Sequence, residues 1–168
     1  MPQALFIAER ALPGLKAASD LVHLRTERPL QFVDVTELVA ERVRRSEIEH
    51  GLVCVQSLHT TAALLVNENE PLLVEDLKRV LERLVPADLA YGHDDLARRE
   101  NVSEAERRNG HAHARALLLA PSTTLTVVGG ALVLGRWQRV FLVELDGGRP
   151  RSLSILVLGV PFEAPRWS

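Results

Sequence analysis

The sequence predicts an α+β fold with two main helices, one short helix and antiparallel or mixed sheets. Apolar patterns run in the order strands, helix, strands, helix and then a run of strands. This order is not the regular strand–helix alternation of a barrel or a doubly wound sheet. Loops in the C-terminal half are short, which favours antiparallel neighbours there. The length of 168 residues suits one domain that spans 1–168.

The N-terminal quarter predicts a pair of strands followed by a helix. Apolar runs at 5–8 and 21–24 flank a turn at Pro13-Gly14. Asp34 then lies three residues before Glu37, which is the spacing of a helix capping box. The helix after it has one apolar face, made of Val35, Leu38, Val39 and Val43.

The middle of the chain predicts two strands and the second main helix. Strands are expected at 51–56 and 63–66, separated by a polar break around His59. The helix begins at Pro71, where a missing N–H does no harm, and stops at Pro86. Asn69 or Glu70 can cap it. Its apolar positions are Leu73, Leu77, Val80, Leu81 and Leu84.

The last third combines a charged segment with a run of strands. Residues 94–108 are dense in charge and predict an exposed, mobile loop. A short helix is expected at 112–119. Turns at Gly129-Gly130 and at 146–148 separate the strands that follow, which are expected at 125–128, 132–134 with 137–145, and 153–158.

Composition excludes several classes of function. The net charge of −2 and the absence of a basic, aromatic stripe argue against nucleic acid as a partner. No apolar run approaches the roughly 20 residues that span a membrane. The single cysteine, Cys54, lies in an apolar run and predicts a buried thiol in a reducing compartment. With no secretion signal recognised at the N-terminus, a cytoplasmic location is expected.

Histidines are the first candidates for chemistry. His59, His93 and His113 lie in polar segments with no obvious solvent role. Neutral imidazole is a common zinc ligand, and three protein ligands with one open position are typical of catalytic zinc. The alternative is that they are hydrogen-bonded structural residues or loop residues. His23 and His50 are interpreted as structural.

Acidic and amide side chains form a second group of candidates. Asn67 and Glu68 end a strand and are interpreted as anchors for a ligand or a metal-bound water, or else as part of a helix cap. Asp76 borders the apolar face of the second helix. It is expected either to orient a histidine or to be a half-exposed carboxylate.

The third group lies among the C-terminal strands. Gly135 predicts a bulge or a close backbone approach, Trp137 a core or interface position, and Gln138 a buried polar group that needs hydrogen bonds. Arg149 and Arg151 flank a turn, where they either clamp a phosphate or are solvated.

Several segments, in this order, resemble the YjbQ-type secondary thiamine-phosphate synthase family. The resemblance covers about residue 15 to Gly159, and its most diagnostic part is a serine, alternating apolar residues, a glycine and then Gly-x-Trp-Gln. Arg136 stands where the family usually has threonine, and Ala120 replaces a usual glycine. The segments are 57–63, 67–69, Asp76, 91–94, 109–113, 122–138 and 147–151.

The resemblance implies a sandwich-like α+β fold and a homotrimer with sites near subunit contacts. It also implies a transferase that joins hydroxymethylpyrimidine diphosphate to thiazole phosphate and releases pyrophosphate, as a weak or secondary activity. On this basis we expect three sets of site residues: catalytic His59, Glu68, Asp76 and Gln138; substrate-binding Thr60, Asn67, Trp137, Arg149 and Arg151; and metal-binding His59, His93 and His113.

The expected partner is therefore a small phosphorylated metabolite, and the expected cofactor is a divalent metal. Three histidines suit zinc, whereas magnesium, which prefers oxygen ligands, suits a diphosphate substrate. Two alternatives stay open. One is another zinc enzyme, such as a hydrolase with Glu68 or Asp76 as general base. The other is a protein that binds a phosphorylated metabolite without catalysis.

Overall fold

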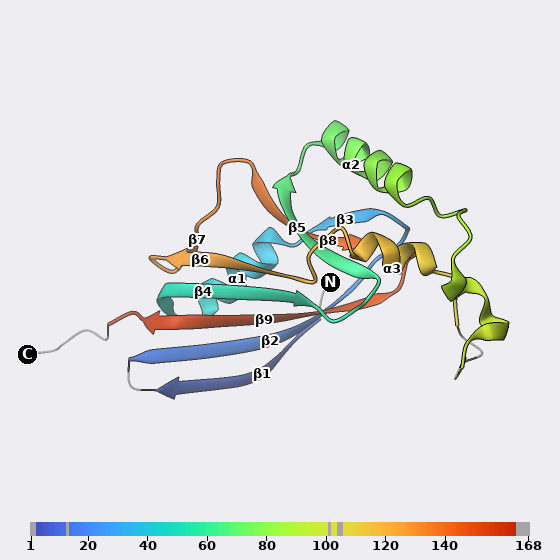
Figure 1. Cartoon of the computed structure of the whole chain (residues 1–168). Coiled ribbons are helices and arrows are strands. Elements are labelled where there is room, and N and C mark those ends of the chain that lie inside the picture. Colours follow the sequence, from blue (N-terminus) through green and yellow to red (C-terminus); the bar gives the residue numbers. More distant parts are fainter. Residues whose placement is uncertain (1–2, 13, 101, 104–105, 164–168) are drawn as a thin grey trace, which may run out of the picture.

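The computed structural model describes residues 3–12, 14–100, 102–103 and 106–163, so Pro13 and part of the charged segment lie outside the described residues. It has the predicted α+β class (Figure 1). The elements are β1 Gln3–Leu12, β2 Leu15–Arg25, β3 Gln31–Asp34, α1 Thr36–Arg45, β4 Ile48–Ser57, β5 Ala62–Glu68, α2 Pro71–Leu84, short 3-10 turns at Gly92–Asp94 and Leu96–Arg98, α3 Gly110–Ala116, β6 Ser122–Val128, β7 Ala131–Leu132, β8 Gln138–Glu144 and β9 Pro150–Pro161.

The strands form two antiparallel sheets. The larger sheet has the order β1-β2-β9-β4-β6-β7, and the smaller has the order β3-β8-β5. The short loops predicted that the C-terminal strands are antiparallel neighbours in one sheet. This prediction is wrong for β8, which lies in the smaller sheet. After β7 the chain leaves the larger sheet and forms β8, which pairs with β3 and β5, before it returns to the larger sheet as β9. Its position follows from its residues: Val140 and Leu142 pack on one face while Phe141 and Val143 pack on the other, so it must be covered on both sides.

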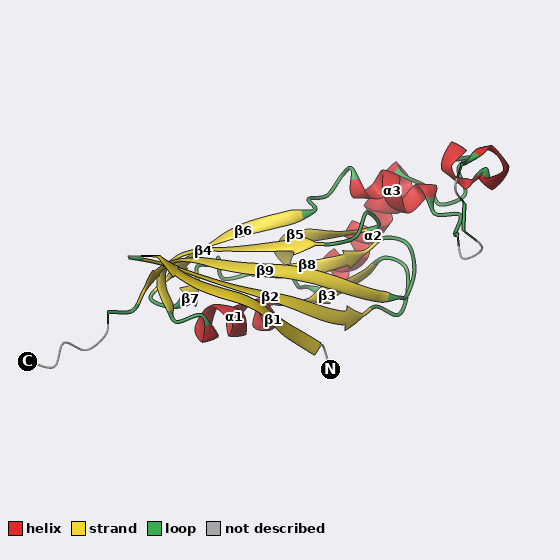
Figure 2. Cartoon of the chain, turned by 90° about the horizontal axis from the view of Figure 1, so that it is seen from below, coloured by secondary structure: helices red, strands yellow, loops and turns green. Residues whose placement is uncertain are grey.

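Two hydrophobic cores hold the layers together. In Figure 2 the larger sheet lies over α1 and over the smaller sheet. The main core joins the inner face of the larger sheet, one face of the smaller sheet and α1. The second core joins the other face of the smaller sheet to Leu81 of α2 and Ala112 of α3. The smaller sheet is thus the middle layer, and α3 is fixed against its outer face.

Helix α1 begins differently from the expected capping box. Its N-cap residue is Val35, whose own side chain makes no capping hydrogen bond. Asp34 instead ends β3, which the sequence did not predict, and its Oδ1 accepts a hydrogen bond from the Thr36 N–H at 2.9 Å. The apolar face was predicted correctly, because Val35, Val39 and Val43 are all buried.

Helix α2 begins and ends as predicted. Glu70 is the N-cap residue, and its carboxylate accepts hydrogen bonds from the N–H groups of Leu72 and Leu73. The predicted apolar face, however, is only partly covered in the single chain. Leu81 is buried, whereas Val80 and Leu84 are 50% and 64% exposed. None of the helices in the described residues is long and apolar enough to cross a membrane.

Two of the turns that connect the sheets lie at the same end of the molecule, beside residues 26–30, which connect β2 to β3. Residues 58–61 connect β4 of the larger sheet to β5 of the smaller one, and residues 145–149 connect β8 back to β9. The strand registers place these turns side by side, since Ser57 pairs with Leu153 and Ala62 pairs with Glu144. Side chains on both turns therefore meet at one place.

Candidate functional site

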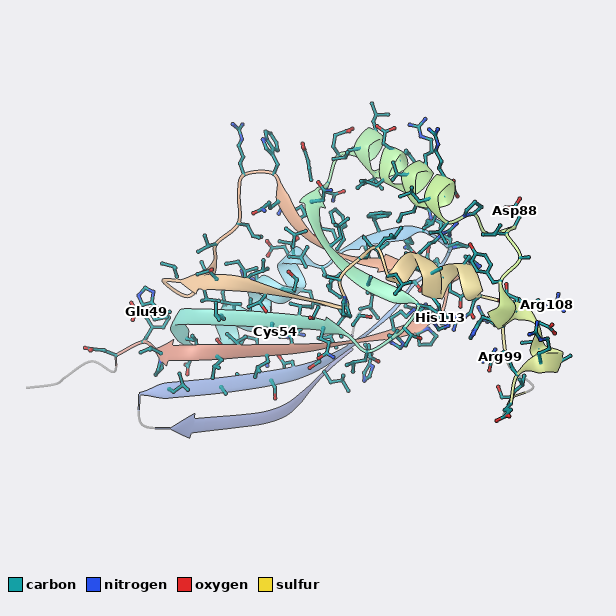
Figure 3. All side chains as sticks on the ribbon, in the orientation of Figure 1. Glu49, Cys54, Asp88, Arg99, Arg108 and His113 are labelled. Carbon is teal, nitrogen blue, oxygen red and sulfur yellow. The ribbon has the colours of Figure 1, made fainter. Side chains whose placement is uncertain are left out.

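A polar cavity of about 400 Å³ lies where the two crossing turns meet α3. Figure 3 shows His113, on α3, beside the end of the β4–β5 region, and Arg99 on the segment that extends past it. Histidines 59, 93 and 113, which come from three separate segments, all line this cavity. The full lining is Leu58, His59, Thr60, Thr61, His93, Arg99, Glu106, Asn109, His113, Arg149 and Arg151.

An apolar hollow adjoins the polar cavity. Its volume is about 740 Å³, and the two hollows share His59, Thr60 and His113. The remaining lining consists of small and aliphatic side chains, namely Ala62, Ala63, Ala114, Ala116, Leu117, Leu119 and Pro121. The site therefore has a polar half and an apolar half, with histidines at the junction.

The relative position of His93 and His113 is set by contacts between the 3-10 turn and α3. Their ring centroids lie 4.6 Å apart. The Asp94 carboxylate accepts a 2.8 Å hydrogen bond from the Gly110 N–H. A Cβ on Gly110 would lie 2.5 Å from the Cβ of Tyr91, so only glycine allows this approach. His111, by contrast, lies with its ring against Tyr91.

His59 is held by the first residues of β9. Its Nε2 accepts a 2.7 Å hydrogen bond from the Ser152 N–H. Partial burial lowers its pKa below the ordinary value, and the nearby Arg151 guanidinium lowers it further. Partial burial also lowers the pKa of His113, as does the neighbouring His93 ring. His59 and His113 therefore favour the neutral form at the junction.

Each arginine of the polar cavity is paired with a carboxylate. Arg151 and Glu144 are fully buried and form a bidentate ion pair, with Nε 2.6 Å from Oε2. Arg149 pairs with Asp146, and Arg99 lies 3.1 Å from Glu106. Arg149 and Arg151 thus do not form a free phosphate clamp, because their charges are already neutralised.

Glu144 connects the two sheets beneath the cavity. Burial raises the pKa of its carboxyl, but hydrogen bonds from Arg151, Thr26 and the Asp146 N–H outweigh that effect and leave the pKa below its ordinary value. Thr26, at 2.6 Å from Oε2, ties the carboxylate to the end of β2. The floor of the cavity is therefore a rigid, ionised network.

Unpartnered polar atoms gather at the same place. Among the described residues, four buried side-chain nitrogen or oxygen atoms have no hydrogen-bond partner. Three of them belong to residues that line the polar cavity: Nε2 of His93, Oδ1 of Asn109 and Nε of Arg149. Leaving such an atom unpaired costs about 1–3 kcal/mol, so a cluster of three marks a place where a ligand can bond.

Other predicted site residues lie at the opposite end of β5. Glu68 pairs with Gln138 in the β5–β8 ladder, six residues from the Ala62–Glu144 pair, which is about 20 Å along a strand. Gln138 is exposed rather than buried, and its Oε1 accepts a hydrogen bond from the Gly135 N–H. Trp137 is not a core residue. It is 59% exposed, with the Arg136 guanidinium carbon 4.6 Å from its ring centroid.

Asn67 and Asp76, the other two predicted site residues outside the cavity, lie beside Glu68 and on α2. Asn67 is adjacent to Glu68, and its Oδ1 accepts a hydrogen bond from the Glu68 N–H. Asp76 lies on the exposed side of α2 and pairs with Arg79. Within one chain, neither Asp76 nor the Glu68 end of β5 lines the histidine cavity.

The histidines of the described residues do not form the expected three-histidine metal site. The described part of the chain contains no group of three His, Cys, Asp or Glu side chains placed to hold one metal ion. The Nε2 lone pair of His59 is already used by the Ser152 N–H. As placed, the three histidines do not fit a common metal, although His93 keeps a buried nitrogen without a partner.

Sequence reasoning missed several residues that build the site. Asn109 was noted in a motif but given no role, and Asp146 looked like an ordinary turn residue. Glu144 and Thr26 carried no signal, because a single polar residue at a strand end is common. Asn109 and Asp146 are joined by a 2.9 Å hydrogen bond, which only the fold creates.

Comparisons with known proteins agree on one family. A family model described as UPF0047 protein YjbQ-like matches residues 20–160. A UPF0047 protein of Methanothermobacter thermautotrophicus is 39% identical over 138 residues, 82% of this chain and 90% of that protein. The UPF0047 protein YjbQ of Salmonella typhimurium is 31% identical over 138 residues, 80% of this chain and 93% of that protein.

Solved structures give the same result. A crystal structure described as a YbjQ-like protein of unknown function from Sulfolobus solfataricus superposes with a TM-score of 0.78 at 32% identity. It covers 86% of this chain and 99% of that one. A hypothetical protein of Aeropyrum pernix gives a TM-score of 0.74 at 38% identity, covering 84% of this chain and 98% of that one.

Proposed function

The chain belongs to the YjbQ-like UPF0047 family, and from this premise we propose that it is an enzyme acting on a small phosphorylated heterocycle. The observation that carries the proposal is that three residues lining one cavity each have a buried polar atom without a hydrogen-bond partner. Nε2 of His93, Oδ1 of Asn109 and Nε of Arg149 offer a ligand both donors and acceptors.

The two-part shape of the site supports this class of ligand. The apolar hollow suits a flat ring, because its walls are alanines, leucines and a proline. The polar cavity next to it suits a phosphate through the unpartnered Nε–H of Arg149, which is one of its lining residues. A phosphorylated heterocycle has both parts, and the shared His59, Thr60 and His113 would lie where the two parts join.

The reaction we propose is the formation of thiamine phosphate as a weak activity. The thiazole nitrogen attacks the methylene carbon of the pyrimidine diphosphate, a C–N bond forms, the C–O bond breaks, and pyrophosphate leaves. No protein nucleophile is needed. In this proposal the Arg149 Nε–H, which has no partner in the chain, donates to an oxygen of the leaving group. Because the cavity arginines are already paired with carboxylates, their help to that group is modest, which is consistent with a slow reaction.

The test is turnover of both precursors by matched histidine variants. We expect His113→Ala to lower thiamine phosphate formation about 100-fold, because it removes a group at the junction of the two hollows. His50→Ala is the control, since this exposed histidine lies in β4 away from the cavity. Equal turnover in the His113 and His50 variants would rule out this site for the reaction.

A second candidate function is binding without catalysis. The observation that favours it is the pairing of Arg99, Arg149 and Arg151 with carboxylates, so none of the three arginines that line the polar cavity is a free cation for a departing diphosphate. It predicts that a thiamine precursor raises the melting temperature without being converted. Stabilisation accompanied by pyrophosphate release would favour the enzyme instead.

We also propose that the working form is a homotrimer. Leu117, at the rim of the apolar hollow, is 86% exposed, and the outer face of the larger sheet exposes Leu52, Leu156 and Val160. Such apolar surface is typical of contacts between subunits. Light scattering coupled to gel filtration should then give three times the chain mass of 18.6 kDa. A mass of one chain would remove this proposal.

A further inference from the structure

His59 lies at the junction of the two hollows, and its protonation is determined by one backbone contact. Ser152 is on β9, and its carbonyl accepts a 3.1 Å hydrogen bond from the Leu58 N–H. In an antiparallel strand the N–H and C=O of one residue point to the same side. The Ser152 N–H therefore also faces residues 58–59, where it donates to Nε2 of His59 at 2.7 Å.

A backbone N–H can only donate, so Nε2 of His59 must supply a lone pair. A neutral imidazole has one nitrogen with a lone pair and one with a hydrogen. Nδ1 of His59 therefore carries the hydrogen. The opposite tautomer and the imidazolium would both place an N–H against the Ser152 N–H, which would break the bond and leave a main-chain donor unsatisfied.

We propose that His59 is a fixed hydrogen-bond donor through Nδ1, with Ser152 as its positioning residue, and that it is not a metal ligand. Metal-binding histidines coordinate through a nitrogen lone pair and donate a hydrogen bond from the other nitrogen. His59 has the reverse arrangement, because its single lone pair is used by the Ser152 N–H.

This role also sets the chemistry of the group that His59 recognises. An Nδ1–H donates, so its partner on a ligand is an acceptor, such as a phosphate oxygen or an unprotonated ring nitrogen. The lowered pKa of His59 agrees with a ring that stays neutral, since burial and the Arg151 charge both oppose a proton. The identity of the ligand rests on the proposed function, but the protonated nitrogen does not.

The experiment is long-range ¹H–¹⁵N correlation NMR on the uniformly labelled wild-type chain, with the His59 ring assigned through its own backbone. We expect the pattern of the Nδ1–H tautomer at neutral pH, unchanged when a twofold excess of Zn²⁺ is added. Ser152→Ala is the matched control. It removes the hydroxyl that lies 2.9 Å from Nδ1 of His23 but keeps the N–H, so the His59 pattern should stay the same.

Two outcomes would overturn the proposal: an Nε2–H tautomer in the wild type, or a shift of the Nδ1 resonance to a metal-bound position on adding Zn²⁺. Both outcomes are observed by NMR and do not depend on enzyme turnover. If the thiamine precursors prove not to bind while the Nδ1–H tautomer is observed, the proposed function fails and the assignment of His59 stands.

Discussion

The two ends of β5 differ in almost every property that makes a functional site. At the Ala62 end, two sheet-crossing turns and α3 meet, and three histidines line a cavity whose floor holds the fully buried Arg151–Glu144 pair. At the Glu68 end, the side chains of Gln138 and Trp137 are both exposed. The comparison teaches that a site needs enclosure as well as polar residues, because burial makes unpaired atoms costly and hence available to a ligand.

The largest effect is expected from breaking the buried ion pair at the Ala62 end. Glu144→Gln leaves the Arg151 guanidinium buried with no countercharge, which should lower the free energy of unfolding by about 3–5 kcal/mol. Urea denaturation measures this. Replacing both residues with apolar ones, as Glu144→Leu with Arg151→Met, should recover part of the loss. A Glu144→Gln protein as stable as wild type would show that the buried pair does not anchor this end.

The next effect concerns the contact that positions His93 against His113. Gly110→Ala places a methyl group 2.5 Å from the Tyr91 Cβ and should cost about 1–3 kcal/mol while also weakening ligand binding. Gly92→Ala is the control, because a Cβ there meets nothing within 4 Å. Thermal melts with and without ligand compare the two. Equal losses in both variants would mean that the Tyr91 contact does not position α3.

The histidines near the Ala62 end of β5 should make the free energy of unfolding depend on pH. The pKa values of His59, His111 and His113 are lowered from 6.5, so below that pH the unfolded chain binds more protons than the folded chain. The free energy of unfolding should therefore fall as pH drops from about 7 to about 5. Denaturant titrations at both pH values measure the slope.

The control for this pH dependence is a variant that lacks one of the three histidines. His113→Gln removes one titrating ring and should flatten the dependence. The Glu144 contribution is lost only at lower pH, because a lowered carboxyl pKa keeps its stabilisation above the ordinary value of 4.5. If the free energy of unfolding of the wild type rises as the pH is lowered from about 7 to about 5, the prediction of neutral histidines is wrong.

The smallest effect is expected away from the cavity. Asp76→Asn breaks an exposed ion pair with Arg79 and should change stability by no more than about 0.5 kcal/mol. Turnover should stay near that of wild type, because Asp76 does not line the cavity of its own chain. A large loss of turnover with unchanged stability would show that Asp76 acts in the site of a neighbouring subunit.

Local patterns in the sequence were enough for most elements of the fold. Pro71 and Pro86 bound α2, and the 3.6-residue period of Val35, Val39 and Val43 identifies the buried face of α1. Assigning strands to sheets was not possible from short loops alone, because β8 follows β7 closely yet pairs with β5. The alternation of a strand shows that it has two faces but does not name the element that covers each face.

By itself, the sequence determined the fold class, the boundaries of α2 and the three histidine segments, since each depends on residues close together in the chain. Only the tertiary structure decided which polar residues share a cavity. That depends on two sheet-crossing turns lying at one end, so that Asn109, Asp146, Glu144 and Ser152 meet residues far from them in sequence. The structure also decided the tautomer of His59, because a ring nitrogen has no fixed role until a neighbouring N–H is placed against it.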